Sequence, residues 1–415
     1  MQKTPRANRL HIAIFGRRNA GKSSLVNALT NQDLAVVSTV AGTTTDPVYK
    51  LMEILPLGPV VIIDTAGIDD VGELGELRVK KTREVMSRTD LAIVVIDPES
   101  GVDSYEKELV TELNRREIPI VGVVNKKDKF KQLPFSTLEE KLDLELIPVS
   151  ATEKTGIDEL KEKMILKAPE KFERLNIIGD LIKPEEVVVL VIPIDAAAPK
   201  GRLILPQMQT LRDILDNDAQ GVVVKEEQLA AALNSLQEKP KMVVTDSQAF
   251  EQVAAEVPRD IMLTGFSILF ARYKGDLQIY TQGVTALTNL KPGAKVLIAE
   301  NCTHHRTAED IGTVKIPRWL EEFAGGELHF EHVAGREFAE EIENYDLVVQ
   351  CGGCMTNRKE ILYRLKKAES SGVPIVNYGM LIAYVNGILD RALEPFPTAK
   401  ELWTKKDLLR AKQEQ

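Results

Sequence analysis

The stretch Gly16-Arg17-Arg18-Asn19-Ala20-Gly21-Lys22-Ser23 follows the pattern G-x-x-x-x-G-K-[ST]. It lies between an apolar run at residues 10–15 and a predicted helix at residues 22–29, the position that a phosphate-binding loop occupies. In such a loop the glycines let the backbone approach phosphate groups, and N–H groups at the helix N-terminus face the anion. Lys22 is therefore predicted to reach the β- and γ-phosphates and Ser23 to bind Mg²⁺, with a chance glycine loop as the alternative. The loop residues predicted to contact the nucleotide are Gly16, Asn19, Ala20, Gly21, Lys22, Ser23 and Ser24.

Three further segments follow apolar runs in the same part of the chain. Asp64 ends the run at residues 60–64, where its carboxylate can hold the Mg²⁺ shell, and Gly67 lets a peptide N–H approach the γ-phosphate. Asn125-Lys126-Lys127-Asp128 follows the run at residues 120–124, and the Asp128 carboxylate can accept two N–H bonds from guanine, which adenine lacks. Ser150-Ala151 offers backbone N–H groups to the guanine oxygen. Because all of these segments end predicted strands, where doubly wound sheets bind ligands, they predict a GTP site.

The order of these segments resembles the translation-factor-related GTPases over roughly the first 170 residues, and their Era and TrmE branch in particular. Ala41-Gly42-Thr43-Thr44-Thr45-Asp46 is similar to the switch segment of that branch, so Thr44 is the best candidate for a second Mg²⁺ contact, ahead of its two neighbours. Ile68 stands where a Ras-like enzyme carries a water-orienting Gln. In this branch the residue at Asn19 helps to hold K⁺ beside the phosphates, although Asn19 can equally cap the loop. The resemblance implies slow, K⁺-stimulated GTP hydrolysis, with Lys22, Thr44, Asp64 and Gly67 as the catalytic residues.

The length and composition set limits on the rest of the chain. With 415 residues, three domains are expected at roughly 150 residues each. A hydrophobic fraction of 44% excludes a wholly disordered chain, and the net charge of −9 argues against a protein that coats nucleic acid by charge alone. No apolar run reaches the roughly 18–20 residues of a membrane span, and no signal-peptide core follows the basic N-terminus. We therefore expect a cytoplasmic protein with neither a nucleic-acid nor a membrane partner.

Apolar runs alternate with helical patterns, which predicts an α/β protein of three domains: an N-terminal P-loop GTPase fold followed by two αβ domains with mainly parallel sheets. The expected domains are residues 1–170, 171–272 and 273–415. The predicted strands are residues 10–15, 60–64, 91–97, 120–125, 145–149, 187–194, 221–224, 242–245, 261–263, 295–299, 328–332, 346–349 and 374–377. The predicted helices are residues 22–29, 78–87, 105–116, 157–166, 208–215, 226–236, 247–257, 318–323, 337–343 and 357–370. One more helix, at residues 265–273, carries large apolar groups that suit either a core or a self-association surface.

The three cysteines, Cys302, Cys351 and Cys354, all follow predicted strands of the third domain. Because the carboxyl ends of parallel strands meet at one edge of a sheet, we expect the three thiols to lie together. The Gly-Gly pair inside the C-x-x-C lets the loop turn sharply, and the helix that follows favours thiolate. A redox pair fits this pattern poorly. Zinc with a histidine such as His304 or His305, and an iron–sulfur cluster, both remain open.

Over its full length the chain resembles the family of [FeFe]-hydrogenase maturation GTPases, HydF. Cys302-Thr303-His304 matches the family's C-x-H, Cys351 to Cys354 matches its C-x-x-C, and residues 192–207 are similar to its central-domain signature. The resemblance implies a [4Fe–4S] cluster on the three cysteines, with one exchangeable iron position facing a diiron precursor. The family commonly has His directly before the C-x-x-C, where this chain has Gln350. Water, His304 or Asp195 remain as fourth ligands, and Asp195 can instead cap its own loop.

The resemblance further implies a scaffold and carrier. It would pass a transient diiron unit to apo-[FeFe]-hydrogenase, work with the radical-SAM maturation proteins, dimerise through the middle domain and use GTP as a switch on partner binding. Two other functions stay open. One is an Era- or TrmE-type RNA- or ribosome-associated GTPase with a zinc or redox-sensing C-terminal domain, which the acidic composition disfavours. The other is an enzyme with chemistry at the cluster, which the lack of nearby acid and base residues disfavours.

Overall fold

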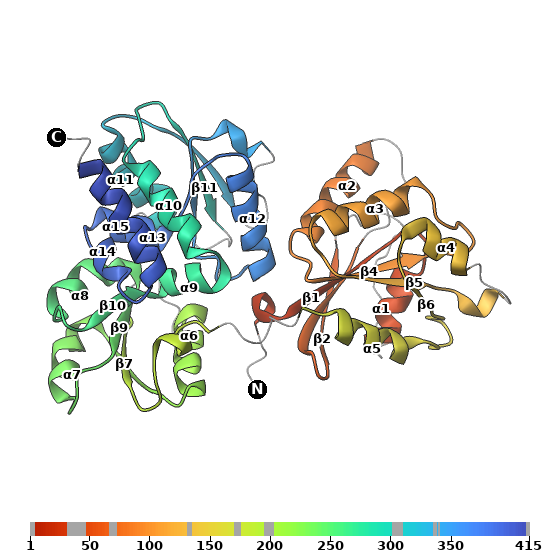
Figure 1. The fold of residues 1–415 in the computed structure, drawn as a ribbon, viewed down its shortest axis with the longest axis horizontal. Coiled ribbons are helices and arrows are strands. Elements are labelled where there is room, and N and C mark those ends of the chain that lie inside the picture. Colours follow the sequence, from red (N-terminus) through yellow and green to blue (C-terminus); the bar gives the residue numbers. More distant parts are fainter. Residues whose placement is uncertain are drawn as a thin grey trace. The chain divides into compact units, whose positions relative to one another are not determined.

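The computed structural model describes residues 5–30, 47–65, 73–130, 135–169, 176–194, 203–300, 310–334, 338 and 341–411. The chain forms two compact units, Met1–Arg174 and Leu175–Gln415. Figure 1 labels the elements of each unit. The three-domain division expected from the sequence therefore stays a prediction, since residues of its second and third domains fall into one compact unit.

The first unit is built on a six-stranded sheet with the order β2-β3-β1-β4-β5-β6. Its strands are β1 (Leu10–Phe15), β2 (Val48–Ile54), β3 (Gly58–Asp64), β4 (Leu91–Ile96), β5 (Ile120–Val124) and β6 (Leu146–Pro148). Its helices are α1 (Lys22–Thr30), α2 (Glu73–Met86), α3 (Ser104–Arg115), α4 (Phe135–Leu142) and α5 (Ile157–Lys167). Neighbouring strands pair in parallel, except that β2 runs antiparallel to β3.

Helices cover both faces of this sheet because its central strands are apolar on both sides. Along β1, Ile12 and Ile14 lie in one core cluster, while Ala13 and Phe15 lie in another. The first cluster includes buried residues of α1 and α5, and the second includes those of α2, α3 and α4. This layering brings the loops after β1, β3, β5 and β6 to one edge of the sheet, where parallel strands present their carboxyl ends.

The second unit contains two four-stranded parallel sheets, ordered β10-β9-β7-β8 and β12-β11-β13-β14. The first sheet comprises β7 (Val187–Val191), β8 (Gln220–Val224), β9 (Met242–Thr245) and β10 (Met262–Gly265), and the second comprises β11 (Lys295–Glu300), β12 (His329–Ala334), β13 (Leu347–Gln350) and β14 (Ile375–Asn377). The helices are α6 (Leu205–Asp216), α7 (Leu229–Ser235), α8 (Phe250–Glu256), α9 (Phe266–Lys274), α10 (Leu277–Leu287), α11 (Ile316–Ala324), α12 (Arg358–Ser370), α13 (Tyr378–Val385), α14 (Leu389–Ala392) and α15 (Pro397–Ala411).

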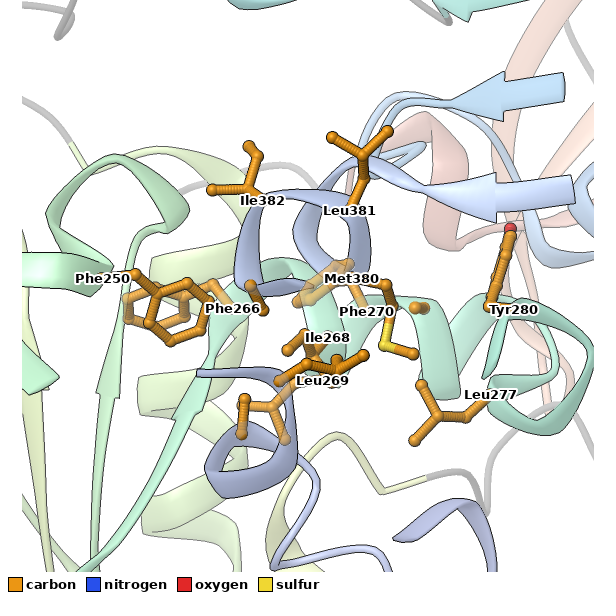
Figure 2. Packing of buried hydrophobic residues seen from close by; sticks show 14 of the residues in the cluster. Phe250, Phe266, Ile268, Leu269, Phe270, Leu277, Tyr280, Met380, Leu381 and Ile382 are labelled. Carbon is orange, nitrogen blue, oxygen red and sulfur yellow. The ribbon is translucent and has the colours of Figure 1, made fainter. Parts of the chain in front are cut away.

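One continuous core joins the two sheets of the second unit. Phe270 of α9 lies in the same buried cluster as Phe250 of α8 and Met380 of α13 (Figure 2). The apolar residues of α9 are thus buried within a single chain, which favours the core over the self-association surface that the sequence also allowed. Arg391 of α14 strengthens this junction, because its guanidinium donates to the carbonyl oxygens of residues 254, 257, 258 and 261 at 2.6–3.3 Å.

The predicted α/β fold with a P-loop unit and parallel sheets is confirmed. The predicted helix at residues 337–343 is wrong where the structure describes it, because residues 338 and 341 are not helical and a 3₁₀ turn spans Ile342–Asn344. The sequence patterns also missed β2, α4, α10, α13, α14 and α15.

Candidate nucleotide and cluster sites

The phosphate-binding loop connects β1 to α1. At two of its positions, neighbouring atoms leave no room for a side chain. Gly16 has a φ of +147°, and a Cβ there would lie 2.4 Å from the carbonyl oxygen of Val95. Gly21 has a φ of +87°, and a Cβ there would lie 2.2 Å from the side-chain nitrogen of Asn125. Asn19 is left-handed as well, with a φ of +61°, which asparagine tolerates better than most residues. Only glycine therefore fits positions 16 and 21 without a shift of neighbouring atoms.

Lys22 begins α1 and turns back over the loop. Its side chain is buried, with 6% of the residue exposed, and Nζ donates to the carbonyl oxygens of Gly16 at 2.9 Å and Arg17 at 2.7 Å. These bonds hold the ammonium against the loop backbone. A cation in this position can pair with phosphate oxygens that enter the loop.

Ser23 and Asp64 meet across the gap between α1 and β3. The Ser23 hydroxyl donates to Oδ2 of Asp64 at 2.6 Å. Oδ1 of Asp64 is buried and has no hydrogen-bond partner among the described residues. Burial raises the pKa of the Asp64 carboxyl above its ordinary value, although Ser23, Lys22 and Lys50 act in the opposite direction. A hydroxyl beside a carboxylate with an unused oxygen is a suitable ligand pair for Mg²⁺, so these residues fit the predicted magnesium site.

Asn125 ties the phosphate-binding loop to the segment after β6. It is 2% exposed, its Nδ2 donates to the Ala20 carbonyl at 2.9 Å, and its Oδ1 accepts from the Ala151 N–H at 3.1 Å. The sequence grouped Asn125 with the residues that recognise guanine. The structure adds that it joins two loops that both belong to the predicted nucleotide site.

The predicted base-recognition residues lie after β5 and β6. Lys126 adopts a left-handed backbone and pairs with Asp97 at 2.5 Å. Asp128 accepts a 2.6 Å hydrogen bond from the Ser150 hydroxyl, and this bond lowers the pKa of the Asp128 carboxyl. An ionised carboxylate on the exposed side of the loop can accept hydrogen bonds from a base, as the sequence predicts.

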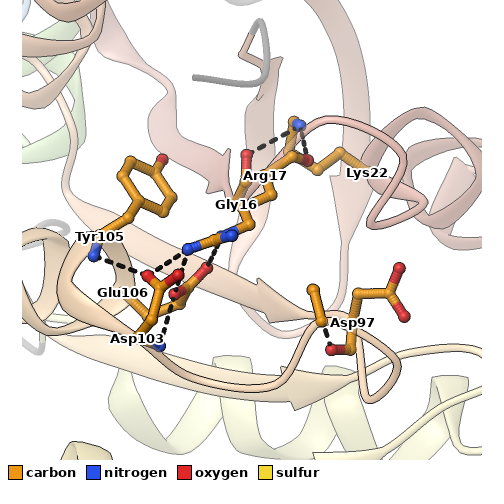
Figure 3. A network of polar contacts seen from close by, with 8 residues as sticks. Gly16, Arg17, Lys22, Asp97, Asp103, Tyr105 and Glu106 are labelled. Carbon is orange, nitrogen blue, oxygen red and sulfur yellow. Dashed lines mark hydrogen bonds and ion pairs between the residues drawn. The ribbon is translucent and has the colours of Figure 1, made fainter. Parts of the chain in front are cut away.

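Arg17, which the sequence analysis assigned no role, anchors the loop to the start of α3 (Figure 3). Its Nε donates to Glu106 at 2.6 Å, and its guanidinium pairs with Asp103. Burial opposes the charged form, but the two carboxylates outweigh it and raise the pKa of Arg17. Asp103 and Glu106 also form the capping box of α3. The capping box was visible in the sequence as Asp-x-x-Glu, whereas its pairing with Arg17 depends on the fold.

The second candidate site lies at the carboxyl edge of the β12-β11-β13-β14 sheet. β11 pairs in parallel with β13, with Ala299 opposite Gln350, and the Cys351 N–H donates to the Ala299 carbonyl at 3.0 Å. β11 ends at Glu300, two residues before Cys302 in the sequence. The strand order therefore brings the carboxyl end of β11 next to the C-x-x-C loop. β11 lies between β12 and β13, so the connections on its two sides run in opposite directions, as at a ligand-binding switch point of a parallel sheet.

Cys351 and Cys354 are half-buried and lie in the loop between β13 and α12. Beneath this loop, Nζ of Lys274 donates to the carbonyl oxygens of Gly353, Cys354 and Thr356 at 2.8–3.0 Å. Burial lowers the pKa of Lys274 to about 8, against the opposing effect of the two cysteines. No sequence pattern indicated this contact, because a lysine at the end of an apolar helix is usually solvated.

Gln350 stands directly before the C-x-x-C and is completely buried. Its Nε2 donates to the hydroxyl of Tyr280 at 3.2 Å, while its Oε1 has no hydrogen-bond partner among the described residues. Burial and the nearby Cys351 raise the pKa of the Tyr280 hydroxyl above its ordinary value. Gln350 and Tyr280 therefore form a buried polar pair next to Cys351.

Five of the predicted site residues, Thr44, Gly67, Asp195, Cys302 and His304, lie outside the described residues. Within the described ranges, no group of three or more His, Cys, Asp or Glu side chains is placed to hold a metal ion. Two of the three predicted cluster thiols are described, and they share one loop. Their sulfur chemistry and half-buried position fit two of the ligands of the iron–sulfur or zinc site predicted from the sequence. None of the described helices combines the length and apolar character needed to cross a membrane.

Three family models match separate parts of the chain. Residues 11–126 match a 50S ribosome-binding GTPase model, residues 177–275 match the hydrogen maturase F dimerization domain, and residues 278–395 match the hydrogen maturase F tetramerization domain. The N-terminal unit is therefore a GTPase domain. The region predicted to carry the cluster matches a model named for tetramerization, a feature that the sequence analysis did not anticipate.

Curated relatives match mainly the GTPase domain. GTPase Der of Kosmotoga olearia is 36% identical over 38% of this chain and 39% of its own length. The tRNA modification GTPase MnmE of Heliobacterium modesticaldum is 38% identical over 36% of this chain and 32% of its own length. The chain thus spans well under half of these relatives. Among solved structures, Era of Aquifex aeolicus bound to GDP and AlF4⁻ is 21% identical, with a TM-score of 0.35, over 52% of this chain and 92% of that one.

The two hydrogen maturase F models match adjacent segments, residues 177–275 and 278–395, and so account for nearly all of the chain that follows the GTPase domain. A GTPase domain joined to both of these segments identifies the family. The chain belongs to the hydrogen maturase F family, the HydF-type hydrogenase maturation GTPases.

Proposed function

We propose that this protein is a scaffold and carrier in [FeFe]-hydrogenase maturation. It binds a [4Fe–4S] cluster, carries the diiron precursor of the active site and delivers it to apo-[FeFe]-hydrogenase, with GTP binding and hydrolysis as a switch on partner binding. The observation that carries the proposal is the parallel register of β11 and β13 inside a hydrogen maturase F segment. That register directs the chain toward Cys302 and the C-x-x-C loop to the same sheet edge.

The proposed cluster ligands are Cys302, Cys351 and Cys354. When bound, the cluster supplies an iron that exchanges its fourth ligand. Gln350 stands at the position where the family commonly has His, and its side chain is fully buried and bonded to Tyr280. This supports a fourth ligand from elsewhere, and we propose Asp195 or His304 for it.

Anaerobic iron and sulfide analysis of the purified full chain tests this proposal. We expect about four irons and four sulfides per chain for a [4Fe–4S] cluster, and their loss in Cys351→Ser and Cys354→Ser variants. Asp195→Ala and His304→Ala are compared by EPR with His329→Ala, which removes an exposed histidine from β12. Zinc in place of iron would refute the cluster. An EPR spectrum unchanged in both fourth-ligand variants would leave water or an external ligand in that position.

The proposed GTP site uses Lys22, Ser23, Asp64 and the residues Thr44 and Gly67 for Mg²⁺ and phosphate chemistry, and Asp128 with Ser150 and Ala151 for the base. The buried Oδ1 of Asp64, which has no hydrogen-bond partner within the described ranges, supports the magnesium role. Asp64→Asn keeps the size of the side chain and removes its charge, so we expect GTP hydrolysis to fall by about 10²-fold, with the defect reduced at high Mg²⁺. Hydrolysis within twofold of wild type at low Mg²⁺ would contradict this role.

We also propose that Asn19 helps to hold K⁺ beside the phosphates. Its left-handed backbone and exposed side chain support this, since an exposed amide is accessible to an ion beside the loop. We expect faster hydrolysis in K⁺ than in Na⁺, with the difference lost in Asn19→Ala and kept in Asn114→Ala, a change at an exposed asparagine on α3. Equal rates in the two salts for the wild-type protein would refute this part of the proposal.

The proposed partners are apo-[FeFe]-hydrogenase, the radical-SAM maturation proteins of the same pathway, and a second copy of this chain that binds through residues 171–272. The dimerization-domain match over residues 177–275 supports the last of these. We propose a cytoplasmic protein with domains at residues 1–170, 171–272 and 273–415. Light scattering of the wild-type protein tests self-association, and a monomer at micromolar concentration would argue against it.

A further inference from the structure

Lys274 is the last residue of α9, and its ammonium lies beneath the C-x-x-C loop. The residue is 2% exposed. Nζ donates to the carbonyl oxygens of Gly353 at 3.0 Å, Cys354 at 3.0 Å and Thr356 at 2.8 Å. A lysine ammonium has three donors, so these bonds account for all of them. Burial of an unpaired charge is costly, and three carbonyl dipoles provide the compensation that keeps this one inside the protein.

The side chain comes from a different part of the chain from the loop that it holds. Lys274 lies within the match to the dimerization domain, whereas the loop lies within the match to the tetramerization domain. A second cation links the same two segments, but its side chain comes from α12 and its partners lie at the end of α9. Nη1 of Arg358, at the start of α12, donates to the carbonyl oxygens of Tyr273 at 2.8 Å and Gly275 at 3.3 Å. Two cations thus cross between the end of α9 and the start of α12, but only Lys274 contacts carbonyls within the C-x-x-C loop.

The bonds to Lys274 also set the direction of the loop peptides. A trans peptide points its N–H away from its C=O. Because the carbonyls of residues 353, 354 and 356 point toward the ammonium, the N–H groups of the residues that follow them point away from it. One side of the loop therefore presents carbonyls to the protein interior, and the other side presents N–H donors.

From this geometry we propose that Lys274 is a positioning residue for the cluster. It fixes the loop that carries two cluster thiols, and its positive charge makes the cluster easier to reduce. The proposal rests on the cluster site proposed above. Reduction adds one negative charge, which a nearby buried cation stabilises, and charge and hydrogen bonds around the sulfurs are known to set cluster potentials.

Three variants of the full chain test this role. Lys274→Met keeps the length of the side chain without its charge or its donors, and Lys274→Arg keeps the charge. Arg358→Met is the matched control, because it removes the other cation of the same junction and leaves the three loop carbonyls paired. We measure iron content, the midpoint potential by stepwise reduction followed by EPR, and amide hydrogen exchange of residues 351–357 in the metal-free protein.

We expect Lys274→Met to retain iron and to shift its reduced-to-oxidised ratio at a fixed potential toward the oxidised form by on the order of tenfold, which is about 59 mV for a one-electron couple. Loop exchange in the metal-free protein should speed up by a similar factor. Lys274→Arg should restore most of the potential, and Arg358→Met should leave both readouts at their wild-type values even if it lowers overall stability.

A wild-type potential and wild-type loop exchange in Lys274→Met would overturn the proposal. If Lys274→Met binds no iron while Arg358→Met and Lys274→Arg bind it, the positioning role is supported in a stronger form, provided that circular dichroism shows a folded protein. If the wild-type chain itself binds no iron, the proposed cluster function fails. Loop exchange in the metal-free protein then still decides whether Lys274 fixes the loop.

Discussion

Asn125→Ala should separate the two loops that this side chain joins. The amide bonds the Ala20 carbonyl at 2.9 Å and the Ala151 N–H at 3.1 Å, and all three residues are buried. Leaving a buried polar group unpaired costs roughly 1–3 kcal/mol, and there are two such groups here. Together they would cost about 2–6 kcal/mol, and water that partly pairs them in the space left by the side chain reduces the loss in free energy of unfolding of the first unit to about 3 kcal/mol.

Amide hydrogen exchange of peptides from residues 120–151 measures this loss in the full chain, because it reports the first unit alone. A loss of about 3 kcal/mol corresponds to exchange on the order of a hundredfold faster. We expect the affinity for GTP to fall at least tenfold as well, since both loops belong to the proposed nucleotide site. Asn114→Ala, at an exposed position on α3, should change the free energy of unfolding by less than about 0.5 kcal/mol. Exchange within about threefold of wild type in Asn125→Ala would refute the reasoning.

Two further predictions concern stability. Gly283→Ala should destabilise the second unit by about 3 kcal/mol in denaturant titrations, because a Cβ on α10 would lie 1.9 Å from the carbonyl oxygen of Ile375; a loss under about 1 kcal/mol would show that α10 can move away. Hydrogen bonding to Arg115, together with Arg116, lowers the pKa of Glu112 to about 2 from an ordinary 4.5. The contribution of Glu112 to stability is therefore complete above pH 4.5 and disappears as the pH falls through 2. Glu112→Gln should reduce the pH dependence of amide exchange in α3 over that interval. An unchanged dependence would contradict the pairing of Glu112 with the two arginines.

The sequence predicted the first unit well because its strands are continuous apolar runs and its loops carry residues with a specific chemical need. It missed β2, whose Lys50 and Glu53 interrupt the apolar pattern, and which is an edge strand with mostly half-exposed side chains. Strand order placed Asp64, Asn125 and Ser150 at carboxyl ends, and the structure has them there.

The second unit was harder to predict because tertiary packing overrides local preference there. Gly283 and several β-branched residues make α10 a weak helix former, but its close approach to β14 requires glycine at that position. Tyr378 begins α13, whose apolar sequence also suits a strand, and burial against α9 selects the helix. Lys274 and Arg17 were missed as site residues for a similar reason, since their partners are distant in the sequence and pairing leaves no local pattern.

Arg391 bears on how this protein can be divided. Its four carbonyl partners lie at residues 254–261, on the other side of the boundary between the two hydrogen maturase F matches at residues 275 and 278. A cut at that boundary would split one continuous core and expose apolar surface on both fragments. Two segments that match separate family models thus share one buried core. Truncations meant to isolate the cluster loop should begin near residue 175, where the second compact unit starts.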